Sequence, residues 1–529
     1  MNFARDVLDR MPAEHLALVE AARDGTRREW SFGEVSERGA RLAGTLARRG
    51  IGRGDVVMTL IGNRPEWVFT MIACFRIGAV VLPCTEQLRA KDLRLRIEAA
   101  RPALIVADER NRAELETALA GPDTAHVVCD AAPTGIEAAP TGTDANAIPV
   151  LLVPDDALFE AEPVPAIELA PEDPCLITFT SGTSGEPKAV LHGQRYLSGQ
   201  HLQAENWLGA KAGELVWCTA ASGWSKSARN VFIAPWLSGA SALLHDARFD
   251  PGERLELLAR ERVNVLCMAP TEYRVIAKRV TLIALQDLRG MVAAGEALNP
   301  EVLQTWREAT GLEIRDGYGQ TETGQLTGMP LGEPARPGSM GRALPGVKLS
   351  VRDGELVADP ASVPTFFLGY LGEGVKRGED GTWCIEDRGG QDADGPAGPR
   401  RTEQWRTGDR VRQDGDGYLW FEGRADDVIV SAGYRIGPFE VESALVAHPA
   451  VAEAAAVAAP DEERGAVVRA VVVLRDGHFP SPALANELQE HVKRETAPYK
   501  YPRIVDFAVE LPKTASGKVR RAALRAEVF

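Results

Sequence analysis

The fold of this chain is indicated most clearly by residues 176–188, which read LITFTSGTSGEPK. The first part is apolar or β-branched and predicts a short buried strand, Leu176–Phe179. Glycines in the loop that follows let the backbone approach a ligand closely, hydroxyls and amides donate to phosphate oxygens, and a lysine adds a cation. The stretch therefore favours a phosphate-binding loop at the end of a buried strand. Its residues are Thr180, Ser181, Gly182, Thr183, Ser184, Gly185, Glu186, Pro187 and Lys188.

Composition alone leaves a second interpretation of this loop, a Ser/Gly linker that ends by chance in Pro-Lys. The position directly after a buried strand argues against it. The loop is not of the Walker A type, because the GxxxxGK[ST] spacing is absent. The one Gly-Lys pair of the chain, Gly517-Lys518, is followed by Val519 and has Pro512 where the first glycine should stand.

Short apolar strands and amphipathic helices alternate along the chain on both sides of this loop. Such alternation predicts an α/β fold with parallel-rich sheets layered with helices. The apolar run Trp67–Pro83, broken by Arg76, reads as a buried helix that leads into a buried strand. The other expected strands are Val56–Ile61, Leu104–Ala107, Ala242–Leu244 and Val263–Met268, and the expected helices are Phe32–Arg49, Arg89–Ala100, Gly252–Arg260 and Pro300–Thr310.

The composition is that of a globular protein of more than one domain, with 529 residues, 45% hydrophobic and 26% charged side chains. A formal net charge of −15 argues against a general nucleic-acid binder, but not against a local basic site. Seven cysteines without a CxxC pair argue against a disulfide framework and for a reducing compartment. With no apolar signal core and no membrane-spanning stretch, we expect a cytoplasmic protein.

A change in the pattern of apolar residues predicts the boundary between the domains. After Arg424, apolar segments at 441–446, 466–474 and 484–492 indicate one small α+β domain. We therefore expect a large domain of residues 1–425 and a small one of residues 426–529. Residues 388–400, RGGQDADGPAGPR, have no apolar period and read as a solvated loop.

Three further motifs carry candidate chemistry. In residues 316–323, DGYGQTET, Tyr318 offers a flat face for a purine, Thr321 a hydroxyl for a phosphate and Glu322 a carboxylate for Mg²⁺. A polar turn after a strand explains this motif equally well. Asp409, in RTGD, could accept both ribose hydroxyls. Residues 414–417 read as an ordinary hairpin turn. Lys518 lies on a glycine-containing turn that could project it into a remote site, although a lysine near a C-terminus is usually solvated.

The order of these motifs resembles that of the adenylate-forming superfamily of acyl-CoA synthetases, aryl-acid ligases, carrier-protein adenylation domains and luciferases. The strings that carry the resemblance are FTSGTSGEPK, AGEALNP, YGQTETG, RTGD, GRADDVIVSAGYRIGP and PKTASGK, spread over nearly the whole chain. Within the superfamily, GDVVMTLIGNRPEW, ASGWSKSA, SAGYRIGPFEVE and TAPYKYPR are most similar to medium-chain acyl-CoA synthetases. The resemblance implies a large adenylate-forming domain and a small mobile lid.

The resemblance also implies roles for single residues. It assigns residues 180–188 to the phosphates of ATP, Thr321 to the α-phosphate and Glu322 to Mg²⁺. Lys518 matches the adenylation lysine, a catalytic residue together with Thr321 and Glu322. The remaining ATP-binding residues that it implies, around adenine, ribose and phosphates, are Gly295, Glu296, Ala297, Asp316, Gly317, Tyr318, Gly319, Gln320, Asp409 and Arg424.

Coenzyme A and the acid have further candidates. Asp426 matches the hinge of the lid, and Trp224 resembles an aromatic wall of the acyl pocket, completed by Gly319 and Thr321. A core tryptophan is an interpretation of equal weight for Trp224. No buried acid or base is evident for an amino group, and most of the eight histidines are expected at the surface. The residues that match coenzyme A contacts are Gln87, Ala432, Gly433, Tyr434, Arg435, Arg464, Lys493, Tyr501 and Arg503.

The leading hypothesis is an AMP-forming acyl-CoA synthetase that uses ATP, Mg²⁺ and coenzyme A on an apolar, medium-length acid. An adenylation enzyme that loads a carrier protein is the alternative. A silent homologue is disfavoured because Glu322, Asp409 and Lys518 are all present. The resemblance also suggests a homodimer and an acetyltransferase acting on Lys518 as partners. Two departures from the family pattern, at residues 359–371 and 388–400, put loop conformation in question.

Overall fold

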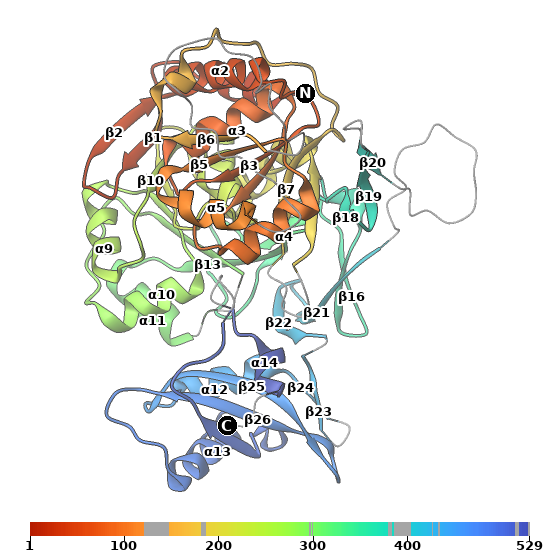
Figure 1. Cartoon of the computed structure of the whole chain (residues 1–529). Coiled ribbons are helices and arrows are strands. Elements are labelled where there is room, and N and C mark those ends of the chain that lie inside the picture. Colours follow the sequence, from red (N-terminus) through yellow and green to blue (C-terminus); the bar gives the residue numbers. More distant parts are fainter. Residues whose placement is uncertain are drawn as a thin grey trace.

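The computed structural model describes residues 1–120, 148–180, 187–295, 298, 300–378, 383–385, 404–425, 427–431, 434–513 and 518–526. Two large sheets, a smaller sheet and a separate C-terminal body make up the fold (Figure 1). Within the described residues, no helix combines the length and the apolar character that a membrane span requires.

The first large sheet is nine-stranded and mostly parallel. Its order is β15 (Arg342–Ala343), β14 (Gly324–Gly328), β13 (Ile314–Gln320), β12 (Gly290–Ala294), β11 (Val265–Cys267), β9 (Leu215–Cys218), β10 (Ser241–His245), β1 (Leu16–Ala21) and β2 (Arg27–Ser31). The second is also nine-stranded: β20 (Trp383–Ile385), β19 (Gly374–Arg377), β18 (Gly369–Leu371), β8 (Ala189–Gly193), β7 (Pro174–Phe179), β4 (Val80–Cys84), β3 (Val56–Leu60), β5 (Leu104–Asp108) and β6 (Val150–Val153).

Alternating side chains of these strands divide the core into layers. In β9, Val216 and Cys218 belong to a central apolar cluster, whereas Trp217 faces a second cluster on the opposite side of the sheet. The central cluster also takes in α2 (Phe32–Arg48) and α3 (Pro65–Ile77). Helices α9 (Pro251–Arg260), α10 (Pro270–Arg279) and α11 (Pro300–Thr310) cover the outer face of the first sheet, and α4 (Ala90–Ala100) and α5 (Arg112–Leu119) that of the second.

The predicted α/β class and the predicted elements are confirmed within one or two residues at their ends. The expected helix at 32–49 is α2, and the run Trp67–Pro83 is α3 followed by β4, as the pattern indicated. Short helices complete the large domain at α1 (Phe3–Asp6), α6 (Arg195–Gly199), α7 (His201–Gln203) and α8 (Ala234–Leu237). Burial on both faces explains why these parallel strands read as continuous apolar runs.

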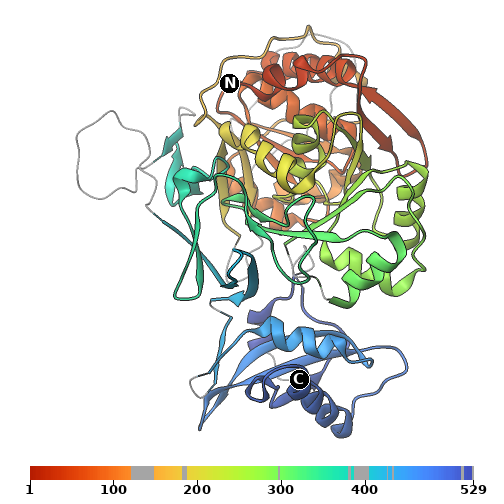
Figure 2. The same ribbon diagram turned by 180° about the vertical axis from the view of Figure 1, so that it is seen from behind.

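A four-stranded sheet lies between the large body and the C-terminal body (Figures 1 and 2). It comprises β16 (Leu349–Arg352), β17 (Glu355–Ala358), β21 (Trp405–Gln413) and β22 (Leu419–Arg424). The predicted hairpin turn at 414–417 is confirmed, because it joins the antiparallel pair β21 and β22. The predicted loop at 388–400 lies outside the described residues.

The C-terminal body contains sheets that pair with none of the preceding strands among the described residues. A hairpin of β23 (Ile429–Ser431) and β24 (Tyr434–Ile436) precedes α12 (Pro438–Ala447). The strands β25 (Val451–Asp461), β26 (Gly465–Leu474) and β27 (Ile504–Phe507) then pack with α13 (Pro482–Glu495) and α14 (Arg521–Ala526). This confirms the small α+β unit that the sequence predicts.

A glycine brings the loop after β9 against the second sheet. Gly223 has a φ of +89°, and a Cβ there would lie 2.9 Å from Cys84 Cα and closer still to Thr85 N. We expect Gly223→Ala to destabilise the large domain by about 2–5 kcal/mol, the sum of left-handed strain and overpacking. Urea unfolding followed by tryptophan fluorescence measures this cost.

Gly213→Ala is the matched control. Gly213 has a similar φ of +80° but open space where its Cβ would stand. It should therefore show the strain of about 1–2 kcal/mol alone. Equal losses in the two variants would contradict the close approach of this loop to the second sheet.

Candidate active site

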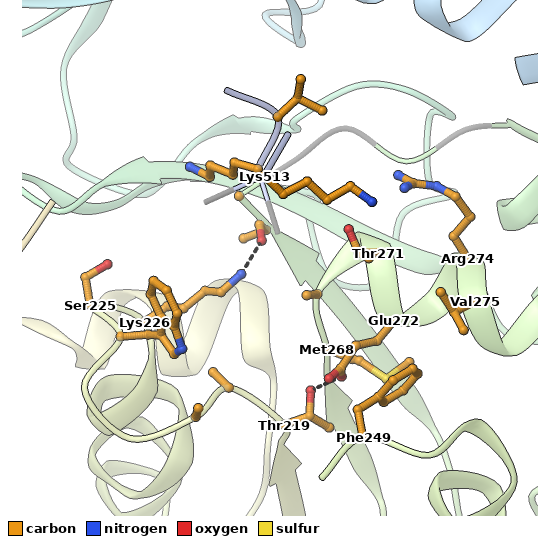
Figure 3. Close-up of a pocket in the computed structure, with 18 of the residues that line it drawn as sticks. Thr219, Ser225, Lys226, Phe249, Met268, Thr271, Glu272, Arg274, Val275 and Lys513 are labelled. Carbon is orange, nitrogen blue, oxygen red and sulfur yellow. Dashed lines mark hydrogen bonds between the residues drawn. The ribbon is translucent and has the colours of Figure 1, made fainter. Parts of the chain in front are cut away.

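A cavity of about 2150 Å³ is lined by residues of both the large body and the C-terminal body. Its walls include the carboxyl ends of β9, β11, β12 and β13, the edge at which open α/β sheets bind ligands. The C-terminal body contributes Lys513 and Lys518 from the segment before α14. Figure 3 shows part of this cavity, with Lys513 opposite residues of the large body.

The buried carboxylate of Asp409 is the centre of a hydrogen-bond network on this cavity. Asp409 is 5% exposed and accepts hydrogen bonds from the Tyr318 hydroxyl, from Gln320 Nε2 at 3.0 Å and from Arg424 Nη1 at 3.3 Å. Burial raises the pKa of Asp409, and the bond from Tyr318 and the charges of Arg424 and Lys518 oppose this shift. The network joins β13 to β21 and β22.

The predicted residues Thr321 and Glu322 follow β13 directly and line the same cavity. Glu322 Oε1 accepts from the Tyr370 hydroxyl at 2.8 Å, and the backbone oxygen of Glu322 accepts from Phe367 N at 2.8 Å. The segment 359–371 departs from the family pattern, yet it holds the candidate magnesium ligand in place. Gly319 lies so close to the backbone of Gly324 that a side chain would not fit.

Of the residues predicted to surround adenine, Gly295 directly follows β12, and Asp316 and Gly317 lie on the neighbouring strand β13; all three line the cavity. Asp316 is buried, which raises the pKa of its carboxyl group to about 8, and its Oδ1 accepts from Gly317 N at 2.8 Å. Lys226 Nζ donates to Ala294 O at 3.0 Å, next to Gly295 (Figure 3). The predicted residues Glu296 and Ala297 lie outside the described residues.

The antiparallel strands β7 and β8 hold the two ends of the predicted phosphate loop together. Thr180 N donates to Lys188 O at 2.9 Å, and Lys188 N donates to Thr180 Oγ1 at 3.0 Å. Lys188 Nζ pairs with Glu373 at 3.0 Å and lies 4.9 Å from the centre of the Tyr370 ring. Thr180 and Lys188 line the cavity, Pro187 connects to β8, and Ser181–Glu186 lie outside the described residues.

Lys518 reaches the cavity from the C-terminal body, far along the sequence from the other site residues. Both Lys518 and Asp409 line the cavity, and the positive charge of Lys518 acts to lower the pKa of Asp409. Two contacts lie nearby: Lys278 Nζ of α10 donates to Ala452 O at 3.2 Å, and Lys513 Nζ pairs with Glu453 at 2.7 Å. The first of these bonds joins the two bodies.

Among the predicted coenzyme A residues whose side chains the structure describes, only Gln87 lines this cavity. Its described wall does not include Tyr434, Arg464, Lys493, Tyr501 or Arg503. Lys493 Nζ lies 4.2 Å from the centre of the Tyr501 ring, and Arg503 Nη1 donates to the Tyr501 hydroxyl at 2.8 Å. Arg464 Nε donates to Ser431 Oγ at 3.3 Å.

Tyr434 is 51% exposed and stacks on Tyr499, with ring centres 4.4 Å apart. Its neighbours Ala432 and Gly433, the side chain of Arg435 and the predicted hinge Asp426 lie outside the described residues. Trp224 is partly buried and lines the cavity.

Sequence reasoning missed three polar side chains near the cavity. Glu272 of α10 is mostly buried, accepts from the Thr219 hydroxyl and lies 3.8 Å from Arg254 (Figure 3). This corrects the expectation that no buried acid is offered there. Arg229 and Asn230 also line the cavity. A charged residue within an otherwise apolar stretch, as at Arg229 in ARNVFIAPW, was the available signal.

Three of the described histidines, His192, His245 and His448, are buried, although most were expected at the surface. His192 is 1% exposed and stacks on Tyr196 with ring centres 4.0 Å apart. Burial, reinforced by the charges of Arg195 and Arg229, lowers the pKa of His192 to about 3. This imidazole is therefore neutral.

Known proteins match the chain over nearly its whole length. Residues 4–371 match the AMP-binding enzyme family, and residues 440–518 match the AMP-binding enzyme C-terminal domain. The acyl-coenzyme A synthetase ACSM4, mitochondrial, of Homo sapiens is 37% identical over 539 residues, covering 99% of this chain and 90% of its own. The acyl–CoA ligase YtcI of Bacillus subtilis is 37% identical over 525 residues, covering 96% and 92%.

Solved structures agree with these relatives. A Brucella canis acyl-CoA synthetase superposes with a TM-score of 0.69 at 33% identity, covering 99% of this chain and 94% of its own. The anthranilate CoA ligase AuaEII, in complex with anthranoyl-AMP, gives a TM-score of 0.82 at 28% identity, covering 99% and 97%. The chain therefore belongs to the AMP-binding enzyme family and, within it, to the acyl-CoA synthetases.

Proposed function

We propose that this acyl-CoA synthetase makes both its acyl-adenylate and its thioester in the cavity between the two bodies. The proposal rests on the position of Lys518. This residue of the C-terminal body lines the same cavity as Asp409, Tyr318 and Glu322 of the large body. A carboxylate must attack the α-phosphate of ATP, which brings two anions together. Fixed positive charge at that point stabilises the transition state.

The large domain, residues 1–425, binds the nucleotide in this proposal. Asp409 accepts the ribose hydroxyls, because its carboxylate is held by donors on three sides. Gly295 and Asp316–Tyr318 surround adenine, and residues 180–188 bind the β- and γ-phosphates. Thr321 and Arg424 complete the phosphate and ribose contacts.

The residues present fit a magnesium ion bound together with ATP. Among the described residues no group of three or more His, Cys, Asp or Glu side chains is placed to hold a metal ion. Mg²⁺ characteristically uses one or two carboxylates plus substrate phosphates. Glu322 would be that carboxylate, held by Tyr370, and the ion would neutralise phosphate charge.

The small domain, residues 426–529, acts as a lid with two positions. In the position seen here Lys518 faces the cavity, and the coenzyme A candidates Arg464, Lys493, Tyr501 and Arg503 do not line it. Rotation about Asp426 would replace Lys518 with residues 432–435, and lid motions of this kind take microseconds to milliseconds. Coenzyme A then attacks the acyl carbon and AMP leaves.

The identity of the acid, the cellular compartment, the oligomeric state and the regulation of the enzyme are further parts of the proposal. The names of the relatives support acyl groups, and a partly buried Trp224 supports an acyl wall at that end of the cavity. We propose a cytoplasmic enzyme, a homodimer, and control by acetylation of Lys518. Loading of a carrier protein is the second candidate, since it shares the adenylation chemistry.

Activity with free coenzyme A tests the proposal directly. We expect purified protein to form AMP and an acyl thioester from ATP, Mg²⁺, coenzyme A and at least one member of a panel of aliphatic and aryl acids, with saturation by coenzyme A. Mass spectrometry of the products provides the measurement. AMP formation without any thioester would favour the carrier-protein alternative instead.

The lid proposal predicts an asymmetric defect in Lys518→Ala. Removal of this charge should slow adenylation, measured by pyrophosphate exchange, by on the order of 10²–10³, the range for loss of one charge-stabilising donor. Thioester formation from supplied acyl-AMP should survive. Lys348→Ala, which removes an exposed lysine of the large body, is the control. Equal loss in both half-reactions would contradict the two-position lid.

A further inference from the structure

The segment that follows β9 brings two positive charges to one wall of the cavity. Trp224, Lys226, Arg229 and Asn230 all line it. Arg229 begins a π-helix, Arg229–Ile233, an irregularity frequently found at functional sites. Figure 3 shows Lys226 bound to a backbone carbonyl, on the wall that faces α10 with Thr271, Glu272 and Arg274.

The guanidinium of Arg229 is buried without a counter-charge. Arg229 is 5% exposed, and no carboxylate of the described residues pairs with it. The Tyr196 hydroxyl is hydrogen-bonded to this side chain but carries no charge, and the Nε of Arg229, like that of Arg254, has no partner among the described residues. Arg254, equally buried and on the same cavity, is by contrast compensated by Glu272 and by His245 Nδ1 at 3.1 Å.

Groups beside Arg229 offer donors rather than acceptors. Gln203 Nε2 donates to Asn230 Oδ1 at 2.9 Å, which uses the acceptor of that amide. The Asn230 Nδ2 group is buried and has no partner among the described residues. Lys226 and Arg229 both act on the pKa of the Cys267 thiol, so the two cations lie near the same end of β11.

Arg229 and Thr321 line the same cavity. The buried ring of His192 is close to both, because the backbone of Thr321 and the charge of Arg229 both act on its pKa. A substrate whose reacting carboxylate lies at Thr321 can therefore extend towards Arg229. No carboxylate among the described residues forms an ion pair with Arg229, and the neighbouring His192 is uncharged.

A buried cation with unpaired donors is costly unless a ligand supplies acceptors. A guanidinium suits a carboxylate, which accepts charge-assisted hydrogen bonds through both oxygens. We infer that the acid activated by this enzyme carries a second carboxylate, which binds to Arg229 while the first reacts at Thr321. This inference rests on the proposed function and names its acid as a dicarboxylic acid, whereas the sequence alone leads us to expect an apolar one.

Matched acids of equal chain length test the inference. The kcat/KM values of hexanoate and adipate, and of octanoate and suberate, are measured by AMP formation in the wild type and in Arg229→Leu. The wild type should prefer the dicarboxylates. The variant should lose about 10- to 100-fold with them, the range for a lost hydrogen bond to a charged group. It should gain with the monocarboxylates, because a buried charge has been removed.

Two other variants separate recognition from folding. Arg229→Gln keeps a long polar side chain without the charge and should lower the preference for dicarboxylates even if Arg229→Leu folds poorly; circular dichroism checks both. Arg254→Leu removes an arginine of equal burial whose charge is compensated, and should leave the preference ratio unchanged.

Wild-type turnover of hexanoate with rejection of adipate, or an unchanged ratio in the Arg229 variants, would overturn the inference alone. Absence of AMP formation from every acid of the panel would overturn the proposed function, and this inference with it.

Discussion

The buried carboxylate of Asp409 is the interaction on which the rest of the site depends. It takes donors from β13 through Tyr318 and Gln320, and from β22 through Arg424, so it connects the first large sheet to the small sheet that leads to the lid. Burial disfavours its charged form and raises its pKa, and the surrounding donors oppose this shift. A preorganised acceptor thus lies at the point where the chain passes from one body to the other.

The cavity is lined by several cations although the chain as a whole is acidic. The chain carries a net charge of −15, yet Lys188, Lys226, Arg229, Arg424 and Lys518 all line one cavity. ATP and a carboxylate repel each other, and low-polarity walls make each fixed cation worth more than it would be in water. Most of these cations are compensated by Glu373, Asp409 or a backbone carbonyl. Arg229 has no such carboxylate within the described part of the chain, which is why it points to the substrate.

Much of the fold could be predicted from sequence because strands and helices follow from the local spacing of apolar residues. Buried parallel strands such as β3 and helices such as α2 have strong periodicity, and the order of the motifs identified the family. Side chains paired across great sequence distance could not be predicted from pattern. Tyr370 binds Glu322, Lys278 binds Ala452 and His192 lies close to Thr321 and Arg229 only because the sheets and the lid pack as they do. The side chains that would recognise the acid could not be predicted from pattern for the same reason, since tertiary packing brings them to the cavity.

The central claim is that one cavity assembles a nucleotide site from the large body and a catalytic lysine from the lid. A crystal structure with a non-hydrolysable acyl-adenylate analogue tests it most directly. The account predicts the ribose hydroxyls on Asp409, the adenine against Tyr318, and Lys518 within hydrogen-bond reach of the linkage that replaces the phosphate. A nucleotide bound away from Asp409, with Lys518 turned to solvent, would contradict it.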